Sequence, residues 1–126
     1  IGLVSADYLN KLNKLIYEYK IDDRVNILSK EVSTNFLISK INEAKMLWLP
    51  YKNISQSGVS YTSIGLRKPF VGYDVGNFRS SFGSKGVAKI LDKNNVENFS
   101  NGVIDMIENE EFYIQNIEKL SLKSSW

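Results

Sequence analysis

The sequence of 126 residues contains no cysteine and no histidine. Because cysteine is absent, the chain has no disulfide framework and no thiolate nucleophile, which suits a reducing compartment. Because histidine is absent, it lacks the commonest general base of enzymes and the commonest metal ligand. Any catalysis by side chains must therefore come from other groups, and we expect neither a metal nor a cofactor.

An excess of charge and long apolar runs are also missing. Lys and Arg together number 16 against 14 Asp and Glu, a net charge of +2. The basic residues do not gather around aromatic ones as a nucleic-acid groove requires. No apolar run approaches the roughly 20 residues of a membrane-spanning helix. We therefore expect no nucleic-acid partner and a cytoplasmic location, with at most peripheral contact between the whole protein and a membrane.

What is present is an alternation of apolar runs and amphipathic segments. Hydrophobic residues make up 43% of the chain and charged residues 24%, as in soluble globular domains. The apolar runs predict strands at 2–5, 25–28, 46–49, 70–73 and 86–91. Helical spacing predicts helices at about 9–19, 35–42, 59–66 and in two segments after Val96. Residues 78–85 show no clear period and are predicted to be a loop with one helical turn.

Polar residues just before the helical segments are candidate caps. Asp7 is predicted to cap the first helix, and Ser33 or Thr34 the second. The second helix should turn Phe36, Leu37 and Ile41 inward. A cap satisfies backbone N–H groups that have no partner in the first turn of a helix. These residues therefore predict where two of the helices begin.

Aromatic residues in and after the predicted strands are more often packed than functional. Trp48 lies within a strand and is predicted to belong to the core. Tyr51 and Tyr73 follow strands and could stack on a nucleobase, but packing is the favoured interpretation. None of the three therefore indicates a ligand.

The alternation of strands and helices predicts an α/β domain with a mainly parallel sheet, spanning residues 1–126 as a single domain. Most of the strands are apolar without alternation, as in sheets that helices cover on both faces. Ligands of such sheets bind at the carboxyl ends of the strands. The loops that follow the strands are therefore where a site is expected.

The known phosphate-binding motifs of this fold class are missing. No Gly-x-Gly-x-x-Gly follows the first strand and no Gly-Lys-Ser/Thr loop occurs, which argues against dinucleotide and P-loop sites. A phospho-receiver module would need an aspartate where Pro50 stands. Ser57-Gly58 remains: a helix start offers free N–H groups and a positive dipole end to a phosphate. The alternative is that Ser57 only caps the helix and Gly58 only permits close packing.

Four short motifs carry a resemblance to a known family. Pro50-Tyr51, the segment 55–59, Lys68-Pro69-Phe70-Val71 and Asp74-Val75-Gly76 occur in this order. They resemble the donor-binding half of GT-B glycosyltransferases of family 4 (group 1). The resemblance implies the C-terminal domain of a GT-B fold, a Rossmann-like parallel sheet flanked by helices. It also implies that this chain is truncated at its N-terminus and lacks the N-terminal acceptor domain.

The resemblance further implies a function. Such a domain binds a nucleotide-diphosphate sugar for hexosyl transfer with retention, here to an envelope polysaccharide or glycolipid acceptor of a bacterium. No metal is implied, and the fragment alone is not expected to be active. The implied roles are diphosphate and sugar binding by Gln56, Ser57, Gly58 and Val59, ribose binding by Thr62, and contact with the base by Lys30, Glu31 and Val32.

The sequence also departs from the family pattern. A pair of glutamates is common in the family, and their positions fall near Ile54 or Ser55 and on Thr62. A further glutamate appears here as Ser80 or Ser81, and Asn77 replaces a glycine. These losses support an alternative interpretation, a non-catalytic GT-B-like binding module. For the cations closest to the motifs, Arg67, Lys68 and Arg79, a solvated surface role is expected rather than phosphate binding.

Overall fold

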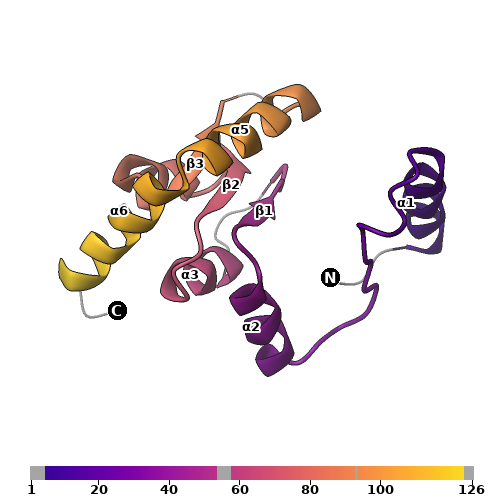
Figure 1. Ribbon diagram of the computed structural model, residues 1–126, viewed down its shortest axis with the longest axis horizontal. Helices are drawn as coiled ribbons and strands as arrows, with labels where there is room; N and C mark the ends of the chain where they lie inside the picture. Colours follow the sequence, from indigo (N-terminus) through magenta and orange to yellow (C-terminus); the bar gives the residue numbers. More distant parts are fainter. Residues whose placement is uncertain (1–4, 54–57, 93, 124–126) are drawn as a thin grey trace. The chain divides into compact units, whose positions relative to one another are not determined.

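The computed structural model describes residues 5–53, 58–92 and 94–123. The chain divides into two units, Ile1–Leu37 and Ile38–Trp126, and each is described by itself. Figure 1 shows the elements of both, with the helix of the first unit at one end of the colour scale. The sheet and its covering helices belong to the second unit.

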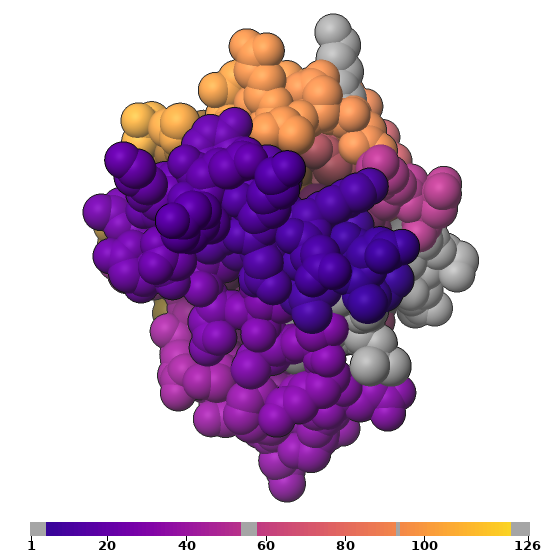
Figure 2. All heavy atoms as spheres, turned by 90° about the vertical axis from the view of Figure 1, so that its right-hand side faces the viewer, coloured from indigo at the N-terminus to yellow at the C-terminus, as the bar shows by residue number. Residues whose placement is uncertain are grey.

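The first unit contains α1 (Ala6–Glu18), in agreement with the predicted helix. Its cap is Ser5, whose Oγ accepts a hydrogen bond from the Tyr8 N–H at 3.2 Å. The prediction of Asp7 as cap was wrong, because Asp7 already lies in the first turn, where its charge favours the helix dipole. No residue of α1 is buried, and Figure 2 draws its atoms in indigo.

The predicted strand at 25–28 is absent, and these residues are irregular. Val25 is 41% exposed, and Asn26 is exposed too. A strand exists only through pairing with a neighbour. Within the part of the chain that the structure describes, no such neighbour is paired with this segment. Most of the strand predicted at 2–5 lies outside the described residues.

The second helix, α2 (Thr34–Glu43), begins as predicted. Ser33 Oγ accepts a hydrogen bond from the Phe36 N–H at 3.1 Å, which makes Ser33 the cap. Ile41 is buried, as expected. Phe36, however, is exposed, because it lies in the first turn beside the cap and not on the side of Ile41.

The sheet is parallel and has the order β1-β2-β3. Its strands are β1 (Leu47–Leu49), β2 (Phe70–Tyr73) and β3 (Ala88–Leu91). The helix α3 (Gly58–Gly65) connects the first two strands. The short helix α4 (Phe78–Ser81) and the 3₁₀ helix η1 (Gly83–Lys85) connect the last two. The predicted α/β fold with a parallel sheet is confirmed, and the region predicted as a loop contains two short helical segments instead of one turn.

The central strand β2 is buried along its whole length and separates two apolar clusters. Phe70 faces one cluster, where its ring centroid lies 5.0 Å from that of Phe78 and 5.2 Å from that of Phe82. Val71 faces the other, with Met106 and Tyr113. Successive side chains of a strand point to opposite faces, so one strand organises both halves of the core.

Two closing helices, α5 (Val96–Glu108) and α6 (Glu110–Lys123), were predicted and are present. Asn95 caps α5, since its Oδ1 accepts from the Asn98 N–H at 2.8 Å. Met106 of α5 and Ile117 of α6 are buried. Among the helices that the structure describes, none has the length and apolar character to cross a membrane.

The prediction that Trp48 belongs to the core was wrong. Its side chain is 60% exposed, and its ring lies edge-to-face with that of Phe99 at a centroid distance of 6.2 Å. Trp48 sits on β1, which in the described sheet pairs with β2 alone and is therefore an edge strand. Tyr73 is buried and donates to the Asn95 carbonyl at 3.0 Å, and Tyr51 packs on the core beside Phe78. Both tyrosines pack as predicted.

A buried hydroxyl joins α5 and α6. Tyr113 is 6% exposed, and its hydroxyl donates to Asp105 Oδ2 at 3.1 Å. The same carboxylate lies 3.5 Å from Lys89 Nζ of β3. Burial, together with the neighbouring Asp105 carboxylate, raises the pKa of Tyr113 to about 12. The neutral phenol is therefore favoured in the folded protein.

This shift predicts a loss of stability in alkali. A tyrosine in the unfolded chain has a pKa near 10, so the contribution is complete below about pH 10 and disappears as the pH rises toward about 12. A shift of this size corresponds to at most about 2–3 kcal/mol, and solvent screening at the exposed Asp105 carboxylate reduces the contribution. Urea unfolding from about pH 9 to about pH 12 should show this extra loss in the parent protein and not in Tyr113→Phe. If the free energy of unfolding fell equally with pH in both proteins, the raised pKa would not belong to Tyr113.

Candidate functional site

The carboxyl ends of β1, β2 and β3 lie at one edge of the parallel sheet, where ligands of doubly wound folds bind. Three loops follow the strands there. They are residues 50–57 before α3, residues 74–77 before α4 and residues 92–95 before α5. The first carries the motif singled out in the sequence, and the other two carry a polar network.

The helix α3 begins at Gly58, as the sequence predicts. Gly58 is exposed, and a Cβ built on it meets no neighbouring atom within 4 Å. Val59, the next residue, is half-buried and packs against the aromatic cluster around Phe70. With respect to the residues that the structure describes, the first turn is thus anchored on one side and open on the other. Gln56 and Ser57, the two remaining residues of the predicted diphosphate site, lie outside the described residues.

Thr62, the predicted ribose contact, is half-buried on the same helix. Its hydroxyl donates to the Gly58 carbonyl at 3.0 Å, so its proton is already used within α3. The oxygen lone pairs of a hydroxyl can still accept hydrogen bonds. Ser63 fixes the other end of the helix by donating to the Lys68 carbonyl at 2.6 Å.

The predicted base-binding residues lie in the other unit. Lys30 and Glu31 are exposed and Val32 is half-buried, in the irregular segment before α2. Gly58 belongs to the unit that begins at Ile38. Contact of these three residues with a nucleobase stays a prediction.

The cations Arg67 and Lys68 follow the C-terminal end of α3. A helix of 8 residues is about 12 Å long, so both lie a helix length from Gly58. Arg67 is exposed and borders a depression of about 260 Å³ with Tyr61 and Ser121. Neither cation lies at the open first turn.

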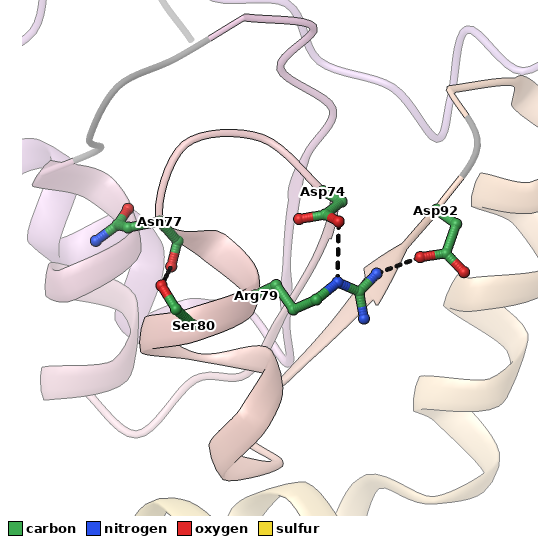
Figure 3. A network of polar contacts seen from close by, with 5 residues as sticks. All are labelled: Asp74, Asn77, Arg79, Ser80 and Asp92. Atoms are coloured by element: carbon green, nitrogen blue, oxygen red, sulfur yellow. Dashed lines mark hydrogen bonds and ion pairs between the residues drawn. The ribbon is translucent and has the colours of Figure 1, made fainter.

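Arg79 joins the ends of two strands (Figure 3). Its Nε donates to Asp74 Oδ2 at 2.9 Å, and its Nη2 donates to Asp92 Oδ1. Asp74 directly follows β2 and Asp92 directly follows β3. The hydrogen bond to Asp74 and the charges of both carboxylates raise the pKa of Arg79. The side chain is half exposed, as a surface cation should be, but it is paired with two carboxylates.

Asn77 points away from Arg79, on the other side of the same loop (Figure 3). Its Nδ2 donates to the Tyr61 hydroxyl of α3 at 2.8 Å and to Ser81 Oγ at 3.1 Å. Its Oδ1 is buried, and the described part of the chain gives it no partner. A buried acceptor without a partner costs about 1–3 kcal/mol of folding free energy. The two hydrogen bonds of Nδ2 therefore hold Asn77 in place despite this cost.

Sequence analysis did not identify the group formed by Asp74, Arg79 and Asp92. A signal was available, because two aspartates follow predicted strands whose carboxyl ends share one edge. An arginine between them in the sequence was the candidate partner.

A second depression, of about 420 Å³, lies along the outer side of β3 and α5. Polar and apolar residues both line it, and Gly102 is among them. A Cβ at Gly102 would meet Leu91 Cδ1 at 3.0 Å, so this glycine lets α5 approach the strand. Its polar lining residues are Lys89, Asp92, Asn98, Asn101 and Asp105.

Comparison with known proteins concerns the fold. No family model matches the chain, and no curated protein matches it in sequence. Among solved structures, sucrose-phosphate synthase from Thermosynechococcus elongatus superposes with a TM-score of 0.72 at 13% sequence identity, over 88% of this chain. In fold, the chain resembles a GT-B glycosyltransferase domain. This chain spans 29% of the length of that structure.

Proposed function

We propose that this glycosyltransferase-like chain binds a nucleotide-diphosphate sugar, as the C-terminal donor-binding domain of a family 4 GT-B glycosyltransferase. The observation that carries the proposal is the open first turn of α3 at the carboxyl edge of the sheet, starting at Gly58. The reaction proposed for the whole protein is retaining hexosyl transfer to an envelope polysaccharide or glycolipid. It would also require an acceptor domain.

The chemistry of the leaving group fits a helix start. When the sugar leaves, negative charge develops on the diphosphate, and N–H groups that already point at it stabilise that charge. The helix dipole adds roughly half a positive charge at the same end. In the proposal, Gln56, Ser57, Gly58 and Val59 contact the diphosphate and sugar. Thr62 accepts a hydrogen bond from the ribose, the loop at Lys30–Val32 contacts the base, and no metal takes part.

A second candidate function is a binding module without catalytic activity. The observation that favours it is Thr62, whose short side chain donates to its own helix where the family pattern has a glutamate. A carboxylate can accept hydrogen bonds from both ribose hydroxyls, whereas one hydroxyl oxygen offers weaker contacts. Both candidates bind the nucleotide. The two candidates are told apart by an activity assay on the whole protein, because only an enzyme would hydrolyse the donor or transfer its sugar.

Thermal unfolding in the presence of UDP, GDP and their sugars tests the proposal. One diphosphate nucleotide should raise the Tm in a dose-dependent way, since at about ten times Kd a ligand adds about 1.4 kcal/mol to the free energy of unfolding. The corresponding monophosphate should raise the Tm less at the same concentration. Sulfate at matched ionic strength is the control. A Tm that no diphosphate nucleotide changes would contradict the proposed function.

A further inference from the structure

We propose that Arg79 is a positioning residue: by binding Asp74 and Asp92 it fixes the loop of residues 74–77, and through Asn77 it fixes the first turn of α3. The effect of Arg79 on the affinity for a ligand rests on the proposed function. Its effect on the loop of residues 74–77 is independent of that function and can be measured in the protein without ligand.

The contacts of Arg79 join three parts of the sheet edge. Asp74 follows β2, Asp92 follows β3, and Arg79 comes from α4, the helix between these strands. The backbone reinforces the connection, since the Asp74 N–H donates to the Leu91 carbonyl at 3.0 Å. Both strand ends are therefore tied to each other and to α4 (Figure 3).

The far side of the loop is tied to α3. Gly76 has a φ of 51°, a left-handed conformation that glycine adopts without strain. Asn77 follows it and donates to the Tyr61 hydroxyl at 2.8 Å. The Tyr61 ring packs against Phe82 at a centroid distance of 5.0 Å, and this packing holds the Tyr61 hydroxyl in place for Asn77. The loop thus connects Arg79 on one side with the first turn of α3 on the other.

Charge alone offers a competing explanation. The group of Asp74, Arg79 and Asp92 carries two negative charges and one positive charge. Without the guanidinium, two carboxylates would face the edge where a diphosphate is proposed to bind and would repel it. Arg79 could then act only by neutralising them. Asp92→Asn separates the two explanations, because it turns an ion pair of Arg79 into a weaker hydrogen bond while removing a negative charge.

Hydrogen exchange of the free full chain tests the contact itself. In Arg79→Ala, amides of residues 74–78 and of the first turn of α3 should exchange about threefold faster, a modest change because the lost ion pairs are exposed to solvent. A lysine ammonium cannot reach both carboxylates in the geometry of the guanidinium. The exchange rates of Arg79→Lys should therefore lie between those of the parent and of Arg79→Ala. Raising the ionic strength from about 0.1 M to about 1 M screens the ion pairs of Arg79 and should therefore speed exchange in the same loop of the parent protein.

The matched control is Lys40→Ala, which removes an exposed cation paired with Glu43 at 3.3 Å on α2. It should leave exchange in the loop unchanged. Unchanged exchange in Arg79→Ala would overturn the proposal. Because Arg79 is half exposed, this variant should fold, which circular dichroism verifies.

UDP and GDP titrations then separate positioning from charge. If Arg79 positions the loop, Arg79→Ala and Asp92→Asn should each raise the Kd, by about tenfold and about threefold. A lower Kd in Asp92→Asn would show that Arg79 acts by charge alone and would overturn positioning. If the parent chain binds neither nucleotide, the proposed function fails, and the exchange result still decides whether Arg79 fixes the loop.

Discussion

Replacing Phe70 with alanine is expected to lower the free energy of unfolding by about 3–5 kcal/mol, the usual loss for a large aromatic residue in a core. Phe70 is completely buried in β2, and its ring touches those of Phe78 and Phe82. The substitution removes these contacts and leaves a cavity between the sheet and α4. The free energy of unfolding of such a domain is about 5–15 kcal/mol, so the substitution removes a large part of it.

Urea unfolding followed by circular dichroism measures the effect. The matched control is Phe112→Ala, because Phe112 is 56% exposed on α6. It should cost less than about 1 kcal/mol, as surface substitutions do. Similar losses for the two variants would mean that Phe70 does not organise the core.

Replacing Gly58 with aspartate is expected to weaken binding of a diphosphate nucleotide at least tenfold, about 1.4 kcal/mol or more. A carboxylate in the first turn of α3 would occupy the positive end of the helix dipole and repel the phosphates. The helix itself should persist, because a Cβ at Gly58 meets open space and an acidic residue favours a first turn. Isothermal titration calorimetry gives the Kd, and far-ultraviolet circular dichroism reports the helix.

Two variants control for this substitution. Gly58→Asn has nearly the same shape as the aspartate without its charge, and should keep most of the affinity. Gly65→Asp places the same charge at the other end of α3, where a Cβ also meets open space, and should leave the Kd unchanged. If Gly65→Asp weakened binding as much as Gly58→Asp, the phosphates would not lie at the first turn.

The sequence predicts those parts of the fold that depend on local pattern. Pro50 ends the first apolar run and Pro69 precedes the second, so β1 and β2 were found close to their true limits. The run at 25–28 has the same character but pairs with no described strand, and pairing is not a property of one segment. Trp48 was misjudged for a related reason, because edge position depends on strand order.

The candidate site was predictable to the same extent. The start of α3 at Gly58 follows from the local Ser-Gly signal. The pairing of Arg79 with two aspartates brings together residues from three segments, and only the parallel topology makes them neighbours. The helix α4 has 4 residues, too few for a periodic pattern to reveal which way Arg79 points.

The most direct measurement of the central claim is an amide proton–nitrogen NMR spectrum of the chain during titration with UDP and then GDP. Such spectra detect even weak binding residue by residue. The account predicts that the largest shift changes fall on the backbone amides of Gly58, Val59 and Ser60, at the start of α3. Changes that fall instead on the depression beside β3 and α5, or no changes with either nucleotide, would contradict it.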